Sequence, residues 1–405
     1  MSRFDCVESA PAIEIFALSK AYKEDTNPQK VDLGIGAYRT NEAKPWVLPV
    51  VRKAEHEIAN DDSLNHEYLS QLGDDLFAQL ATKMLLGDNN KAIEDKRAFG
   101  VQCLSGTGAL RVGADFLRRN AGFKTVYVSD PSWPNHKLLF NHAGFESVRT
   151  YRYWDAANRQ LDFDGLIEDL RNAPEDSVIV LHACAHNPTG IDPTVDQWKA
   201  IADVIEEKKL FPFFDCAYQG FASGDLDKDA NSVRYFVDRG FEILCAQSFA
   251  KNFGLYNERI GNLTVVLKNT TPIVNSKAQI TLLIRGNYSN PPVHGSRIVA
   301  KVLNDPQLYQ EWRECIKSMA GRIQDMRNQL RQNIEKLGTS GKWSHITDQI
   351  GMFSYTGLNK QQIQHLVDNY HIYLPKDGRI SLSGINTQNV EYVAKAINDA
   401  VNQFP

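Results

Sequence analysis

Lys251 occupies a stretch in which an ordinary surface lysine would be unexpected. It follows the apolar, strand-like run FEILCAQSF (241–249), with Ser248 before it and Arg259 after it in QSFAKNFGLYNER. Removing an ammonium group from water is costly, and neither the hydroxyl nor the guanidinium group neutralises it. An amine in such surroundings suits nucleophilic attack on a carbonyl group, including Schiff-base formation with an aldehyde. The alternative interpretation is a surface lysine at the end of a strand.

Asp215 directly follows the apolar run LFPFF (210–214), where an unpaired carboxylate would be expensive to bury. Beside a protonated ring nitrogen it would be paired, and it would keep an aromatic cofactor ring able to withdraw electrons. Tyr218, three residues on, and Asn187, in HNPTG (186–190), carry groups that could bond a ring hydroxyl. The alternatives are a helix N-cap for Asp215 and a turn initiator for Asn187.

The sequence SGTG (105–108) lies between a predicted strand and a predicted helix. Free backbone N–H groups at a helix N-terminus, together with two hydroxyls, suit a phosphate group. The stretch departs from the dinucleotide pattern GxGxxG because Arg111 replaces the third glycine, and it lacks the Gly-Lys-Ser/Thr ending of a P-loop. It therefore indicates a phosphate but neither NAD nor ATP, and a plain turn is the alternative.

The elements that must position these residues alternate between two periodicities. We expect β-strands at 124–130, 177–184, 210–218 and 241–249, and helices between them at 107–120 and 194–209. Near-continuous apolar strands separated by amphipathic helices predict an α/β fold with a mostly parallel sheet covered on both faces. Ligands of such sheets bind outside the carboxyl ends of the strands, where the residues above are expected to lie.

A second pattern follows the predicted sheet. Apolar residues recur at steps of three and four from Leu308 to Leu337. This spacing predicts one helix that begins near Pro306 and ends at Gly338. A helix of about 30 residues exceeds the usual globular length, so we expect it to connect two domains. After Gly338 we expect a shorter α/β segment that ends in an amphipathic helix at 389–404.

Composition narrows the class of protein. The chain has 405 residues and a net charge of −4, with 42% hydrophobic and 23% charged residues, which gives no electrostatic reason to expect nucleic acid or membrane as a partner. The first residues, MSRFDCVESAPAIEIF, resemble neither a secretory signal nor a transit peptide. Six scattered cysteines without zinc-ligand spacing predict reduced thiols and no metal site. We therefore expect a cytoplasmic protein.

Eight stretches, in order along essentially the whole chain, together resemble the fold-type I pyridoxal-phosphate enzymes and, within them, the aspartate aminotransferases. They are GIGAYR (34–39), LNHEYL (64–69), CLSGTGALR (103–111), HNPTG (186–190), DCAYQGFASG (215–224), QSFAKNFGLYNERIG (247–261), IRGNYSNPPVHG (284–295) and KDGRISLSG (376–384). Residues 44–73 are most similar to the eukaryotic cytosolic branch. The resemblance implies a large domain with a mostly parallel sheet (46–309), a smaller α/β domain (15–45 and 310–405) and an N-terminal arm (1–14).

The resemblance also implies a cofactor, pyridoxal 5′-phosphate, and a role for each matching residue. Lys251 matches the Schiff-base lysine, and Asp215 the partner of the pyridine nitrogen. Tyr218 and Asn187 match the pair that binds the ring hydroxyl. The phosphate-binding set is matched by Ser105, Gly106, Thr107, Ser248 and Arg259, with Tyr68 reaching the phosphate from the neighbouring subunit. Trp133 matches the residue stacked on the ring, and His136 and His182 match positions behind it.

Two arginines are implied in substrate choice. Arg379 matches the residue that binds the substrate α-carboxylate, with the backbone of Gly36 beside it. Arg285 matches the residue that crosses a dimer interface to bind the side-chain carboxylate of aspartate or glutamate. The guanidinium fork suits a planar carboxylate. Trp133 and Asn187 are also expected to contact the substrate.

The implied activity is reversible transfer of the amino group between L-aspartate and 2-oxoglutarate, with Lys251, Asp215 and Tyr68 in catalytic roles. Because Tyr68 and Arg285 are expected to act across an interface, the implied active unit is a homodimer with shared active sites that takes dicarboxylic amino and oxo acids. An aminotransferase for aromatic amino acids or kynurenine is one alternative. A catalytically silent homologue that serves as a binding protein is the other.

Overall fold

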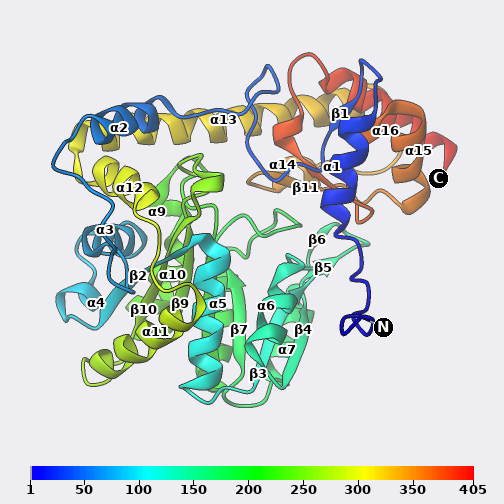
Figure 1. Ribbon diagram of the computed structural model, residues 1–405. Coiled ribbons are helices and arrows are strands. Elements are labelled where there is room, and N and C mark those ends of the chain that lie inside the picture. Colours follow the sequence, from blue (N-terminus) through cyan, green and yellow to red (C-terminus); the bar gives the residue numbers. More distant parts are fainter. Residues whose placement is uncertain (1) are drawn as a thin grey trace.

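The computed structural model describes residues 2–405, and its largest element is a seven-stranded sheet (Figure 1). From one edge to the other the strands are β2 (Ala98–Leu104), β10 (Ile260–Val266), β9 (Ile243–Ser248), β8 (Phe211–Cys216), β7 (Val178–His182), β3 (Thr125–Asp130) and β4 (Ser147–Arg152). Strand β10 is antiparallel to both of its neighbours, and the other adjacent pairs are parallel. The predicted mostly parallel sheet is confirmed, with one reversed strand that was not predicted.

Helices cover both faces of this sheet, which explains why its central strands are near-continuous apolar runs up to the polar residues at their carboxyl ends. On one face Val128 and Phe213 belong to a core shared with α5 (Ser105–Arg119), α6 (Asn135–Ala143) and α11 (Ile273–Asn287). On the other face Leu181 and Phe214 belong to a core shared with α3 (Asp75–Leu86), α7 (Phe163–Arg171), α8 (Val195–Glu207) and α10 (Asn231–Asp238). The short elements of this part are α4 (Lys91–Glu94), β5 (Trp154–Asp155), β6 (Gln160–Leu161), α9 (Leu226–Asp229) and η1 (Tyr256–Glu258).

The predicted long helix is confirmed as α13 (Pro306–Lys336). The Asp305 side chain accepts hydrogen bonds from the first free N–H groups, Pro306 occupies the first helical position, and Gly338, with φ of 69°, follows the end. In Figure 1 the helix runs from α2 (Pro49–Ala59) and α12 (His294–Asn304) at one end to α14 (His345–Asp348) and α16 (Val390–Gln403) at the other, all of which it contacts.

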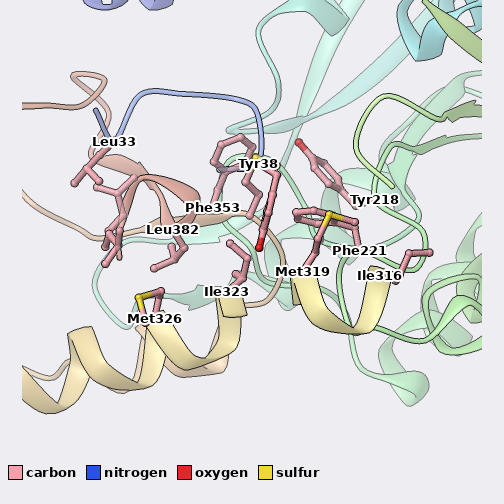
Figure 2. Packing of buried hydrophobic residues seen from close by; sticks show 14 of the residues in the cluster. Leu33, Tyr38, Tyr218, Phe221, Ile316, Met319, Ile323, Met326, Phe353 and Leu382 are labelled. Atoms are coloured by element: carbon pink, nitrogen blue, oxygen red, sulfur yellow. The ribbon is translucent and has the colours of Figure 1, made fainter. Parts of the chain in front are cut away.

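The apolar face of α13 belongs to one buried cluster that is shared by the elements at both of its ends (Figure 2). Met319 lies on the side of Phe221, and Met326 lies on the side of Leu382. Trp312 donates its indole N–H to the carbonyl oxygen of Asn252 at 2.8 Å, so the helix holds the residue next to Lys251.

Segments from the two ends of the chain assemble around the far end of α13. Strand β1 (Val31–Asp32) pairs in parallel with β12 (Ile372–Tyr373), and β11 (Phe353–Tyr355) pairs antiparallel with β13 (Arg379–Ser381). The surrounding helices are α1 (Glu14–Glu24), α15 (Lys360–Tyr370), η2 (Leu382–Gly384) and α16. The α/β segment and closing helix expected after Gly338 are therefore present. Within residues 2–405, no helix combines the length and apolarity needed to cross a membrane.

Candidate active site

The chemically interesting residues gather at one edge of the large sheet. Strands β7, β8 and β9 are parallel. Strand β7 ends at His182, β8 ends at Cys216, the residue after Asp215, and β9 ends at Ser248. Strand β10 runs in the opposite direction, so its first residues, beginning at Ile260, reach this same edge. The edge therefore collects the residues that follow three parallel strands and those that precede the reversed one.

Lys251 lies in the turn after β9, with its ammonium nitrogen 5.0 Å from the centre of the Tyr218 ring. Removal of this ammonium group from water lowers the pKa of Lys251 below its usual range. The Asp215 carboxylate opposes the shift, and the Arg259 guanidinium adds to it. The result is an amine that gives up its proton more readily than a surface lysine, as a nucleophile or a general base requires.

Asp215 is held ionised by a chain of hydrogen bonds that passes through two histidines. The backbone N–H of Asn187 donates to Nδ1 of His182 at 3.0 Å, which leaves that neutral ring with its proton on Nε2. From there the chain continues from His182 Nε2 to Ser132 Oγ (3.4 Å), from Ser132 Oγ to His136 Nδ1 (2.9 Å), and from His136 Nε2 to Asp215 Oδ2 (2.8 Å). Each group donates to the next, so the chain delivers an N–H donor to the carboxylate.

Burial by itself would raise the pKa of Asp215. The hydrogen bond from His136, followed by the electrostatic effects of His136, His182 and Lys251, outweighs burial, and the pKa of this carboxyl group is lowered. His136 and His182 were expected behind the ring, and the structure gives both a definite contact. Ser132 was not predicted, because the contacts of its hydroxyl group with His136 and His182 form only when the chain folds.

The N-terminus of α5 forms the other end of this edge. Within the described chain, no side chain caps the first turn of the helix, so the N–H groups of Ser105, Gly106 and Thr107 are open to an anion. The hydroxyl oxygens of Ser105 and Ser248 lie 3.1 Å apart at the same place. The guanidinium group of Arg259 is exposed and donates to the carbonyl oxygen of Tyr256 at 2.8 Å. This donor set fits a phosphate group.

Gly261, on β10, makes the close approach of the first residue of α5 and of β9 possible. A Cβ atom at Gly261 would lie 2.4 Å from the carbonyl carbon of Ser105 and 2.7 Å from the carbonyl oxygen of Gln247, both of which are backbone atoms that cannot rotate away. We expect Gly261→Ala to lower the free energy of unfolding by about 1–3 kcal/mol, since overpacking at a rigid site forces the backbone to shift. Urea unfolding measures this change.

Gly321→Ala is the matched control for Gly261→Ala. Gly321 is inside α13, and among the described residues no atom beyond its chain neighbours and the adjoining backbone of the helix lies within 4 Å of its added Cβ. Alanine there should raise the free energy of unfolding by about 0.5–1 kcal/mol, because glycine is unfavourable inside a helix. Equal changes in the two variants would contradict the close approach at Gly261.

Tyr218 lies beside the Lys251 amine, and Trp133 and Asn187 contact the two histidines of the chain that leads to Asp215. Tyr218 is buried, and desolvation raises the pKa of its hydroxyl group. The Trp133 ring meets the edge of the His136 ring at a centroid distance of 5.3 Å. Asn187 is partly buried, and its backbone begins the hydrogen-bond chain to Asp215.

Arg379 lies on β13, in the part of the molecule beyond α13. Its Nη2 donates to the carbonyl oxygen of Gly34 at 3.1 Å, and its guanidinium carbon lies 4.2 Å from the centre of the Phe353 ring. Its Nε atom is buried and has no hydrogen-bond partner among residues 2–405. Gly36 is exposed beside Gly34. The guanidinium fork is therefore incompletely paired, which suits the arrival of a carboxylate.

Tyr68 and Arg285 lie outside this group of residues. Tyr68 is 83% exposed, and Arg285 is an exposed residue of α11 that donates to Ser289 at 2.6 Å. Their segments touch, because Asn290 donates its side-chain N–H to the carbonyl oxygen of Leu69 at 2.6 Å. Both side chains therefore belong to one region of the surface.

Asp192 was not predicted, although it shapes the loop that carries Asn187. Its carboxylate accepts the backbone N–H groups of Ala185 at 2.6 Å and His186 at 2.9 Å. In sequence it is an ordinary loop aspartate five residues after Asn187, and its backbone partners leave no signal in residue types.

Burial raises the pKa of Asp192 to about 6, although its two backbone hydrogen bonds oppose the shift. Between the unfolded value of about 3.9 and this folded value the native state binds more protons. The stability that Asp192 contributes is therefore greatest at low pH and is lost as pH rises toward 6. We expect the difference in free energy of unfolding between the parent protein and Asp192→Asn to fall by about 1–3 kcal/mol from pH 4.5 to 7. Urea unfolding across this range tests the sign.

Asp196→Asn is the control for the pH series, because the exposed Asp196 pairs with Lys199 and its pKa is lowered. Its pairing contributes stability above the unfolded pKa, so the difference from the parent should not fall as pH rises. A flat difference for Asp192→Asn would show that the carboxyl group titrates alike in the folded and unfolded chains.

Comparison with known proteins defines the class to which this site belongs. Residues 28–397 match the family model described as aminotransferase class I and II. The chain is 57% identical over 401 residues to the cytoplasmic aspartate aminotransferase of Caenorhabditis elegans, with 99% of this chain and 98% of the relative covered. The chain belongs to the class I and II aminotransferases, which are pyridoxal-phosphate-dependent enzymes.

Solved structures agree with this assignment. The aspartate aminotransferase from Saccharomyces cerevisiae cytoplasm superposes with a TM-score of 0.96 at 44% identity, covering 100% of this chain and 99% of that one. An aromatic-amino-acid aminotransferase from Burkholderia pseudomallei, covalently bound to pyridoxal phosphate, has a TM-score of 0.96 at 40% identity over 99% of this chain and 100% of its own. The expected fold-type I architecture is confirmed.

Proposed function

We propose that the protein is a cytoplasmic aspartate aminotransferase that reversibly transfers the amino group between L-aspartate and 2-oxoglutarate, giving oxaloacetate and L-glutamate. The observation that carries the proposal is the Lys251 amine, with its lowered pKa, beside the ionised Asp215 and near the incompletely paired Arg379. The 57% identity to a cytoplasmic aspartate aminotransferase supports both the substrates and the compartment.

The residues at the sheet edge fit pyridoxal phosphate. The turn at Ser105, Gly106 and Thr107, with Ser248 and Arg259, would hold the phosphate. Asp215 would accept a hydrogen bond from the pyridine nitrogen, Tyr218 and Asn187 would bond the ring hydroxyl, and Trp133 would cover the ring. When bound, the cofactor supplies an aldehyde that bonds to amines and a cationic ring that withdraws electrons from Cα.

The protein side of the mechanism follows from these positions. Arg379 binds the α-carboxylate beside Gly36 and fixes the direction of the Cα–H bond. The Nζ atom of Lys251 removes the Cα proton as general base, and its lowered pKa keeps a usable fraction of the amine neutral. The hydrogen bond from His136 keeps Asp215 anionic, so this carboxylate could hold a proton on the ring nitrogen of a bound cofactor.

Two copies of the chain complete the site in this proposal. Tyr68 and Arg285 are exposed on one surface region of their own chain, from which they would reach the phosphate and the substrate side-chain carboxylate of the partner's site. The N-terminal segment carries exposed Phe4, Val7 and Ile13, which suits an arm packed on the partner; of the predicted arm 1–14, residue 1 lies outside the described residues. The division into large (46–309) and small (15–45 and 310–405) domains belongs to the same proposal.

A half-reaction tests the proposed function. Holoenzyme mixed with L-aspartate alone should release one oxaloacetate per active site and change its visible absorption, and 2-oxoglutarate should then restore the original spectrum and release glutamate. L-phenylalanine in place of aspartate tests the aromatic alternative. Purified protein that binds no cofactor and releases no oxo acid would instead support the silent binding protein.

A further inference from the structure

Arg327 is a charged side chain in the core of the part beyond α13. It is 0% exposed, and across the described residues it forms no ion pair with a carboxylate. Its guanidinium group donates to three backbone carbonyl oxygens, those of Ile346 (2.8 Å), Gly351 (2.8 Å) and Phe353. Burial lowers the pKa of Arg327 to about 9, which still leaves it charged at neutral pH. A buried charge without a counter-ion is costly, so these three contacts need an explanation.

The three carbonyl groups belong to one segment, residues 346–353, which reaches both halves of the proposed site. At its end, Phe353 places its ring 4.2 Å from the Arg379 guanidinium carbon, and β11 continues from there to pair with β13. In its middle, the N–H of Ile350 donates to the carbonyl oxygen of Gly190 at 2.7 Å, in the loop that carries Asn187. A Cβ atom at Gly351 would lie 2.4 Å from Cβ of Ala185, so the segment has little freedom to shift there.

We infer that Arg327 is a positioning residue for Arg379: by holding the carbonyl groups of Gly351 and Phe353, it fixes the ring against which the substrate-binding guanidinium lies. The inference rests on the proposed role of Arg379 in binding the α-carboxylate. The planar fork is needed because it bonds three carbonyl oxygens in fixed directions, whereas a lysine ammonium is a point charge on a flexible stem. Among residues 2–405 the Arg379 side chain makes one hydrogen bond, to Gly34, so its placement depends on this ring.

This inference predicts that replacing Arg327 weakens the binding of every ligand that Arg379 holds by a carboxylate group. Arg327→Lys keeps the positive charge and loses the fork. We expect it to weaken succinate binding to the holoenzyme about tenfold and to lower kcat/KM for aspartate and phenylalanine by equal factors, since both carry an α-carboxylate. The visible spectrum of the bound cofactor should stay unchanged, because the residues around Lys251 are not displaced.

Arg331→Lys is the matched control. Arg331 lies one turn further along α13 and donates to the Thr347 hydroxyl at 2.7 Å, at the start of the same segment, but it is partly exposed and also bonds Glu335. Among residues 2–405 it donates to none of the three carbonyl groups that Arg327 holds. It should bind succinate as the parent protein does. Equal succinate affinities for Arg327→Lys and Arg331→Lys would overturn the inference.

A double-mutant cycle with Arg379→Lys separates positioning from a general loss of stability. If Arg327 acts through Arg379, Arg327→Lys should cause no further loss of succinate affinity in the Arg379→Lys background, whereas independent losses would multiply and overturn the inference. If Arg379→Lys itself binds succinate normally, the proposed role of Arg379 fails instead. Should Arg327→Lys not fold, Phe353→Leu tests the last link: it should reproduce the tenfold loss, and unchanged affinity would overturn the inference.

Discussion

Replacing Lys251 by alanine is expected to lower kcat for the aspartate reaction by about 10⁴-fold or more, because the same amine is proposed as cofactor anchor and general base. Lys251→Arg should be equally inactive, since a guanidinium group stays protonated and cannot accept the Cα proton. Steady-state and single-turnover rates measure the loss. The structural ground is the lowered pKa of this lysine, which its burial and the Arg259 guanidinium lower against the opposing effect of Asp215.

A control and a chemical test accompany this prediction. Lys199→Ala removes an exposed lysine that pairs with Asp196, and it should leave the rates unchanged. Borohydride reduction of the holoenzyme followed by peptide mapping should place the reduced cofactor on residue 251. A label on another lysine, or kcat of Lys251→Ala within tenfold of the parent, would remove Lys251 from both roles.

The second large effect is expected at Arg285. Arg285→Ala should lower kcat/KM for aspartate and glutamate by at least about 30-fold and leave phenylalanine nearly unchanged, since only the dicarboxylic acids lose a charged partner, at a cost of about 2–5 kcal/mol. Within the part of the chain that the structure describes, Arg285 is exposed and bonds Ser289 alone, so the prediction also tests whether its carboxylate-binding site lies in another subunit.

Lys277→Ala, on the same helix α11, is the control for charge. The Lys277 ammonium group lies 5.2 Å from the centre of the Phe99 ring, so it occupies a different surface. It should not change the preference between aspartate and phenylalanine. Mixing the inactive Lys251→Ala with Arg285→Ala, which is impaired on aspartate, should restore aspartate activity in hybrid dimers that hold one intact site. No restoration under subunit exchange would contradict a site shared between chains.

The parts of the fold with strong local patterns could be predicted from sequence. The strands that precede Asn187, Asp215 and Lys251 are buried on both sides and read as continuous apolar runs. The stripe of α13 is regular over its whole length. Reversal of β10 was not predicted, because strand direction depends on which neighbour the strand joins and not on its own residues.

Residues that hold the site residues in place were harder to predict from the sequence than the site residues themselves. Lys251 and Asp215 stand out because each is a charged residue at or shortly after the end of an apolar strand. Asp192 acts through backbone N–H groups, and no residue pattern records these partners. Arg327 left a usable signal: it lies four residues after Ile323 and three before Leu330, on the apolar stripe of α13 itself. A charge at a stripe position indicates a buried role.

The pairing of β1 with β12 constrains when the enzyme can mature during synthesis. Val31 leaves the ribosome early, but its partner Ile372 is among the last residues to be made, and Gly36 and Arg379 are separated in the same way. The large sheet can form while the chain is still being translated. A nascent chain must therefore keep its first segment unpaired until translation is nearly finished, and the substrate pocket is the last feature to be assembled.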